Sequence, residues 1–159
     1  VFSWTLILLL VYQDKATLLD PHWARSLGLQ RPYGQHGGST SSRGQPEASA
    51  LMTESVNAGK ILHLPSKKTL SDGTAGGIES EAITFQLCSD LVDSYVVVSE
   101  EEIGQAMRSF IDSHHMLIEG AAGVAIAGCL AKKEEYLGKN IVVIICGGNI
   151  SRETLKQVI

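Results

Sequence analysis

The chain has 159 residues, 44% of them hydrophobic, which is enough for one domain with a single core. Its formal net charge of −4 and its scattered lysines and arginines exclude the basic surface that nucleic-acid binding requires. Cys88, Cys129 and Cys146 form neither a CxxC pair nor a zinc-ligand spacing, so they argue against a disulfide framework and predict a reducing, cytoplasmic location.

The first 43 residues differ in composition from the rest of the chain. Residues 1–12, VFSWTLILLLVY, are apolar, but a membrane span takes about 20 residues and a secretory signal needs a basic start and a cleavage site. We expect a buried or displaced strand or helix and no membrane partner; a targeting remnant and membrane contact are the alternatives. The Pro, Gly and Ser content of residues 13–43 predicts a loop or a disordered segment. We therefore predict two parts, residues 1–43 and a structured part at 44–159.

Between residues 49 and 98 the sequence alternates between short helical and short extended patterns, separated by Gly and Ser signals. We expect, in order, a helix capped by Ser49 and closed by Gly59, a strand over 61–64, a loop over 65–77 with a DGTAGG turn, a helix capped by Ser80 with Ile83, Leu87 and Leu91 on one face, and a strand over 95–98.

Residues 99–131 predict two helices. Ser99 and Glu102 have the spacing of a capping box. Apolar residues then recur at intervals of three and four, which predicts an amphipathic helix whose stripe faces the core and which ends near His114 and His115. Residues 120–130 are rich in Gly and Ala, as suits a helix packed closely on a sheet. The apolar stripe consists of Ile103, Ala106, Met107, Phe110 and Ile111.

The last part of the chain contains its most informative pattern. Residues 141–145 form an apolar, β-branched run without polar alternation, which predicts a strand over 139–145 buried on both faces of a parallel sheet. Cys146 and the sequence Gly-Gly-Asn149 follow, and then Ser151 is a candidate N-cap for a final helix. Open α/β sheets bind ligands at the carboxyl ends of their strands, so we expect a site here. The alternation of strands and helices predicts an α/β fold.

Three segments, TLSDGTAGG at 69–77, LIEGAAGVA at 117–125 and CGGN at 146–149, resemble the C-terminal half of the fold-type II pyridoxal-phosphate enzymes. The likeness is strongest to the threonine and serine dehydratases, with serine racemase a near relative. The motifs run from about Gln45 to Asn149. Their abrupt start suggests an alternative exon, a read-through of non-coding sequence or a misassembled gene model, and the missing initiator Met suggests a fragment. The ordered set is QPEAS, AGKI, PSKKTLSDGTAGGI, AITFQLC, LVDSYVVVSEEEI, EGAAGVA and CGGN.

The resemblance implies part of a three-layer, parallel-sheet sandwich of the tryptophan synthase beta-like type. It implies a pyridoxal phosphate cofactor, L-threonine and L-serine as substrates of a dehydratase (ammonia-lyase), and a homo-oligomer for the full-length form. The residues that it places around the cofactor are Cys146, Glu119, Gly73 and Asn149. From the residues alone, Cys146 is equally a buried thiol, Glu119 a carboxylate that favours a helix N-terminus, and Gly73 part of a plain turn.

The sequence also departs from the family pattern. No lysine stands in the S-F-K-x-R-G segment that carries the Schiff-base lysine, and no GGGGL-type phosphate loop is present, so we name no catalytic residue. Gln45 and Leu51 stand where relatives place cation ligands, so we predict no metal site. We expect this chain alone to be inactive. The alternatives are a non-catalytic fragment that associates with full-length subunits, serine racemase-like activity, and a thiol enzyme that uses Cys146.

Overall fold

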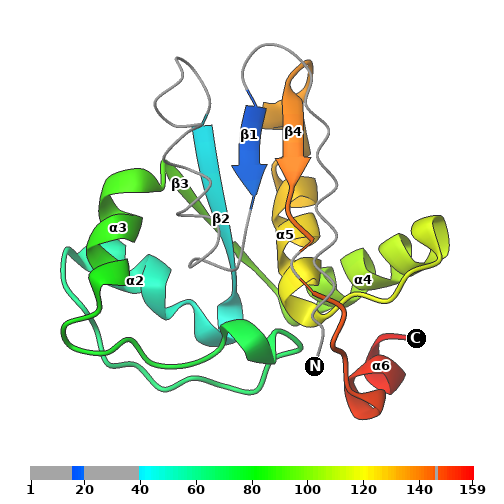
Figure 1. The fold of residues 1–159 in the computed structure, drawn as a ribbon, viewed down its shortest axis with the longest axis horizontal. Coiled ribbons are helices and arrows are strands. Elements are labelled where there is room, and N and C mark those ends of the chain that lie inside the picture. The colour runs from blue at the N-terminus through cyan, green and yellow to red at the C-terminus, as the bar shows by residue number, and fades with distance from the viewer. Residues whose placement is uncertain (1–15, 20–39, 146) are drawn as a thin grey trace.

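The structure is a computed structural model, and it describes residues 16–19, 40–145 and 147–159. In this part of the chain, four parallel strands form one sheet in the order β3-β2-β1-β4 (Figure 1). The register pairs Leu18 of β1 with Ser41 of β2 and Val142 of β4. It also pairs Gly44 of β2 with Val96 of β3. The strands are β1 (Ala16–Leu19), β2 (Thr40–Pro46), β3 (Ser94–Val98) and β4 (Asn140–Val143).

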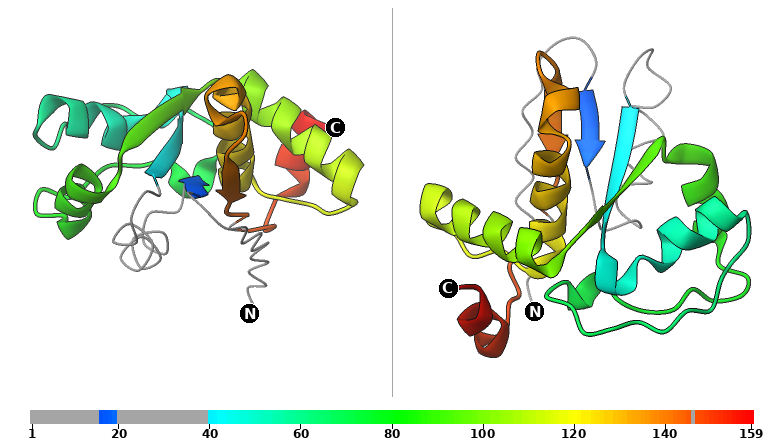
Figure 2. Two further views of the ribbon diagram at one scale, coloured as in Figure 1. Left: turned by 90° about the horizontal axis from the view of Figure 1, so that it is seen from above. Right: turned by 180° about the vertical axis from the view of Figure 1, so that it is seen from behind.

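Helices cover both faces of this sheet. A Cβ at Gly44 of β2 would lie 2.9 Å from Val124 of α5, whereas the neighbouring Arg43 donates to Cys88 of α3. Because successive side chains of a strand point to opposite faces, α5 and α3 lie on opposite sides of β2. Seen from behind, α5 crosses the sheet and α4 packs beside it (Figure 2). The helices are α2 (Leu51–Ala58), α3 (Ile83–Leu91), α4 (Glu100–His114), α5 (Gly120–Ala131) and α6 (Arg152–Val158), with 3-10 turns η1 (Glu47–Ser49), η2 (Asp72–Thr74) and η3 (Lys133–Tyr136).

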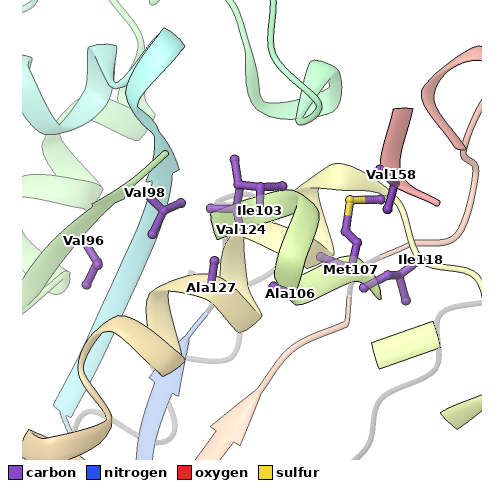
Figure 3. Close-up of a cluster of buried hydrophobic side chains, with 10 residues drawn as sticks. Val96, Val98, Ile103, Ala106, Met107, Ile118, Val124, Ala127 and Val158 are labelled. Carbon is purple, nitrogen blue, oxygen red and sulfur yellow. The ribbon is translucent and has the colours of Figure 1, made fainter. Parts of the chain in front are cut away.

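The core lies between β3, α4 and α5. Ile103 and Met107 of α4 are fully buried against Val124 of α5, and Val98 of β3 closes the cluster (Figure 3). Gly123 of α5 gives α4 room, because a Cβ there would lie 2.6 Å from Met107. Small residues on α5 therefore let the two helices pack closely, as the Gly and Ala content of 120–130 predicts.

Most of the elements predicted from residue 95 onward are confirmed, together with the α/β fold class. Ser99 and Glu102 form both hydrogen bonds of the capping box, and α4 ends at His114 with His115 in the left-handed conformation. Ser151 accepts a hydrogen bond from the Thr154 amide and caps α6. Helix α2 ends at Gly59, which has a left-handed φ of 65°.

The loop predicted for residues 13–43 is wrong at 16–19 and at 40–43, because these residues belong to β1 and β2. Ser41 accepts from the Asp93 amide and donates to the Leu91 carbonyl, and Ser94 donates to Ser42 at 2.9 Å. Hydrogen bonds to neighbouring segments thus satisfy a polar strand in the middle of the sheet, where composition alone predicts a loop. The predicted division at residues 43 and 44 falls inside β2. The predictions for residues 1–12 and for 20–39 lie outside the described residues.

Five smaller predictions are also wrong. Residues 61–64 form no strand. Helix α2 has Ala50 at its N-cap in place of Ser49, and α3 has Ala82 in place of Ser80; Ile83 is 73% exposed, so it is not on a buried face. Strand β4 is shorter than predicted and only half-buried, because it is the edge strand of the described sheet. Within the described residues, no helix has the length and apolar content needed to cross a membrane.

Candidate functional site

The parallel strands place their carboxyl ends at one edge of the sheet. In Figure 1 the arrows of β1 and β4 point to this edge, and the beginning of α5 lies there as well. The loop 147–149 follows β4, and η2 contacts the start of α5. Three segments that are far apart in the sequence therefore meet where open α/β sheets bind ligands.

Glu119 connects two of these segments through both its backbone and its carboxylate. Its amide donates to the Gly147 carbonyl at 3.0 Å, and the Asn149 amide donates to its Oε2 at 3.3 Å. A Cβ at Gly147 would lie 2.5 Å from the Glu119 carboxyl carbon, so only glycine leaves room for this carboxylate. Glu119 thus fixes the course of the chain directly after Cys146.

The third segment is the turn that contains Gly73. The Gly73 amide donates to Asp72 Oδ1 at 2.8 Å, and the hydroxyls of Ser71 and Thr74 are 2.6 Å apart. The first residue of α5, Gly120, touches the backbone just before this turn, and a Cβ there would overlap the Leu70 carbonyl. The turn is therefore tightly connected to the helix that begins after Glu119.

The structure brings three of the four predicted cofactor-lining residues to this edge. Glu119 and Asn149 share a hydrogen bond, and the turn of Gly73 lies against the start of α5. Gly73 and Asn149 are exposed, whereas Glu119 is half-buried. Cys146 lies outside the described residues. That these residues line a cofactor stays a prediction.

The described lysines lie away from this group of segments or are exposed. Lys132 follows the last residue of α5, at the opposite end of the helix from Glu119, and pairs with Glu135 at 3.4 Å. The described part of the chain therefore shows no buried lysine at this edge. The exposed lysines are Lys60, Lys67, Lys68, Lys133, Lys139 and Lys156.

Gln45, which the family resemblance places at a cation-ligand position, accepts hydrogen bonds from Thr53 in this structure. Its side-chain oxygen accepts from the Thr53 amide at 2.7 Å and from the Thr53 hydroxyl at 2.6 Å. Because Ala50 offers no side-chain cap, Gln45 takes that place for the first turn of α2. Among the described residues, no three His, Cys, Asp or Glu side chains gather as metal ligands would.

The sequence does not predict the structural role of Glu100. Its Oε2 accepts from the Leu70 amide at 2.7 Å and so connects α4 to the segment before the Gly73 turn. The sequence shows Glu100 only as one of three glutamates after Ser99, and the two partners are 30 positions apart. No local pattern reports such a contact.

Of the two described thiols, Cys88 is buried and Cys129 half-buried, and burial favours the neutral form of both. Burial raises the pKa of Cys88, and the nearby Arg43 guanidinium offsets part of that rise. Burial also raises the pKa of Cys129 and, together with Cys88, that of Tyr95, whose hydroxyl donates to the Cys88 carbonyl at 3.0 Å. Cys88 lies fully buried in the core, whereas Cys129 is only partly buried.

Comparison with known proteins finds a matching family, similar sequences and similar structures. A family model described as pyridoxal-phosphate dependent enzyme matches residues 28–147. The L-threonine ammonia-lyase of Geobacter sulfurreducens is 36% identical over 106 residues, which cover 66% of this chain and 26% of that protein. The serine racemase of Schizosaccharomyces pombe is 30% identical over 109 residues, which cover 69% of this chain and 33% of that protein. The processed form of threonine deaminase isoform 2 from Solanum lycopersicum is 28% identical, with a TM-score of 0.79 over 91% of this chain and 43% of that one.

Two points follow from these matches. The chain spans less than half the length of each of these three relatives. The family match also begins at residue 28, upstream of Gln45, where the quoted motifs start. The polar stretch between these positions carries no motif that resembles the family, and only a comparison over the whole domain detects it.

Proposed function

Because this chain belongs to the family of pyridoxal-phosphate dependent enzymes, we propose that it forms one wall of the cofactor site of a threonine or serine dehydratase. Such an enzyme eliminates water from L-threonine or L-serine and releases a 2-oxo acid and ammonia, as in amino-acid catabolism. The observation that carries the proposal is the convergence of Glu119, the loop 147–149 and the Gly73 turn at the carboxyl edge of the sheet. The similarity to L-threonine ammonia-lyase supports the choice of substrate.

The residues at this edge suit a flat ring. Gly73 is exposed, and its backbone has no Cβ that would keep a planar group away. When bound, pyridoxal phosphate supplies the electron sink for bond breaking at the substrate α-carbon. Glu119 would hold the loop that carries Cys146 and Asn149, and the Cys146 thiol would hydrogen-bond the pyridine nitrogen. A thiol does not keep that nitrogen protonated, which favours elimination over transamination.

The chain by itself is proposed to be inactive. A Schiff-base lysine is required for this chemistry, and the described lysines are exposed or, for Lys132, paired at the far end of α5. The lysine would therefore come from residues outside the described part or from a longer subunit.

Titration of the purified chain with pyridoxal phosphate, followed by absorbance, tests the proposal. We expect saturable binding that weakens about tenfold in Glu119→Ala, because the loop 147–149 loses its anchor. Glu153→Ala is the matched control, since Glu153 is exposed on α6, and it should bind like the wild type. Binding that never saturates in the wild-type chain would contradict the proposal.

Borohydride reduction of the same samples then tests for a Schiff base. We expect no stoichiometric pyridoxyl-lysine in mass spectrometry of the digested chain. A stoichiometric adduct on one lysine would show that the chain has a reacting lysine of its own, and the inactivity proposed above would be wrong.

A second candidate function is association with longer subunits of the same family. It is favoured by exposed apolar side chains, including Leu137 at 74% and Leu130 at 52%, and by the half-buried edge strand β4. Co-expression of this chain with a full-length dehydratase should lower the activity of the dehydratase and give co-purification of the two proteins. Unchanged activity without co-purification would contradict this role.

A serine racemase-like activity is favoured only by the similarity to that enzyme of Schizosaccharomyces pombe. Homo-oligomerisation of the full-length form and a cytoplasmic location belong to the same proposal.

A further inference from the structure

The segment before the Gly73 turn is held through both backbone polar groups of one residue, Leu70. The Leu70 amide donates to Glu100 Oε2 at 2.7 Å, and the Leu70 carbonyl lies against Gly120. These contacts come from the first residues of α4 and α5. The turn after Leu70 therefore depends on two helix starts that also pack against the core.

Glu100 is available for this contact because other residues cap α4. Ser99 and Glu102 form the capping box, and the exposed Glu101 accepts from Gln105 on the helix surface. The carboxylate of Glu100 points instead to the Leu70 amide. A carboxylate in the first turn of a helix is favourable, and a charged acceptor makes a stronger hydrogen bond than a neutral one.

The second oxygen of the same carboxylate supports a role beyond helix capping. Glu100 Oε1 is buried and has no hydrogen-bond partner among the described residues. An unsatisfied buried acceptor destabilises the fold. Helix stability alone therefore does not account for a carboxylate placed at this position and directed at the Leu70 peptide.

We infer that Glu100 is a positioning residue that fixes the Asp72–Gly73 turn through the Leu70 amide. The inference rests on the proposed function, because it assigns Glu100 to the turn that would border the cofactor. Glu100 holds the segment before this turn, whereas Glu119 holds the loop 147–149. The two glutamates thus fix two different segments of the same edge.

Hydrogen–deuterium exchange of the full chain tests this inference with three variants. In Glu100→Ala, amides between residues 66 and 77 should exchange about tenfold faster, the factor expected for loss of a charge-assisted hydrogen bond. Glu100→Gln keeps an acceptor oxygen and should recover most of the protection. Glu101→Ala is the matched control, with the same charge change one residue away, and should leave exchange unchanged.

The exchange of α5 serves as an internal reference. Its amides should keep wild-type protection in all three variants, because the contact of Glu100 is local. Wild-type exchange at 66–77 in Glu100→Ala, or no recovery in Glu100→Gln, would overturn the inference. If Glu100→Ala also speeds exchange in α5, the two other variants decide the outcome. Protection at residues 66–77 that is retained in both Glu100→Gln and Glu101→Ala supports the inference, and its loss in Glu100→Gln overturns it.

Pyridoxal phosphate titration of the same variants separates this inference from the proposed function. If the wild-type chain shows no saturable binding, the proposed function fails while the exchange data still decide the role of Glu100. If the wild type binds, Glu100→Ala should raise the dissociation constant about fivefold or more and Glu100→Gln should restore it. Equal binding by Glu100→Ala and wild type would overturn a positioning role toward the cofactor.

Discussion

Strands β2 and β3 are neighbours in the sheet, but different interactions hold them in place. Strand β3 buries Val96 and Val98 in the core under α5. Strand β2 is buried along more of its length than β3, yet its buried side chains include Ser42, Arg43 and Gln45. β3 is stabilised by apolar burial, whereas β2 depends on hydrogen bonds to Asp93, Ser94 and Thr53. We call β3, α4, α5 and α6 the apolar half and β2, α2 and α3 the polar half.

This difference indicates which substitutions would destabilise each half. Loss of a methylene in the apolar half leaves a cavity, whose cost grows with its volume. Loss of one hydrogen-bond partner in the polar half leaves a buried donor or acceptor unsatisfied. The two halves therefore respond to different kinds of substitution.

Met107→Ala should give the largest loss of stability. Met107 is fully buried between α4 and α5, and a large-to-small change of this kind costs about 2–5 kcal/mol. Urea denaturation measures the change. Met116→Ala is the control, because Met116 is 42% exposed and should change stability by less than about 0.5 kcal/mol. Equal effects of the two substitutions would contradict the assignment of the apolar half as the core.

Gly120→Ala should follow, at the upper end of the about 1–3 kcal/mol that overpacking costs. A methyl group there meets the Leu70 backbone, which has no rotamer with which to move away. Gly77→Ala, in the loop that follows the Asp72–Gly73 turn, is the matched control, since nothing lies within 4 Å of a Cβ at Gly77. Thermal denaturation of both variants decides whether the contact between α5 and the turn is as close as the structure shows.

Gln45→Leu tests the polar half. The substitution removes the acceptor of the Thr53 amide and hydroxyl, which should cost about 1–2 kcal/mol despite the added apolar surface. Gln157→Leu, at an exposed position of α6, should be nearly neutral in the same urea titration. A stabilising effect of Gln45→Leu would show that β2 is held by apolar burial after all.

The smallest expected effect is that of Cys88→Ala on the pH dependence of stability. Burial raises the pKa of Cys88 above its ordinary value of 9.0, so the folded state binds the thiol proton more tightly than the unfolded state does. This contribution to stability is complete below pH 9.0 and declines as the pH rises through that value. Urea denaturation from about pH 8 to about pH 10 should show a steeper decline in wild type than in Cys88→Ala. Parallel declines would argue that Cys88 does not titrate differently in the two states.

Much of the apolar half could be predicted from the sequence. The period of Ile103, Met107 and Phe110 and the capping box at Ser99 locate α4 to within a residue, because both signals are local. The polar half could not be predicted in this way. Ser41 and Arg43 belong to a buried strand only because distant segments supply their partners, and residue composition does not report such contacts.

In the candidate site, too, local motifs could be predicted from the sequence and contacts between distant segments could not. The resemblance of the three motifs indicates Glu119, Gly73 and Asn149, but not that Glu119 accepts from the Asn149 amide or that a side chain at Gly147 would displace the Glu119 carboxylate. The contact of Glu100 with Leu70 is invisible in the sequence, since it joins two segments 30 positions apart.

By itself, the sequence determined the α/β class, the helices with strong periodicity and the family resemblance, because these depend on neighbouring residues and on motif order. Only the tertiary structure decided that a polar segment forms the strand β2, that β4 lies at the edge of the described sheet, and which carboxylates hold the two loops at its carboxyl end. The physical reason is that hydrogen bonds and close packing between distant segments select one arrangement among the several that local propensity allows.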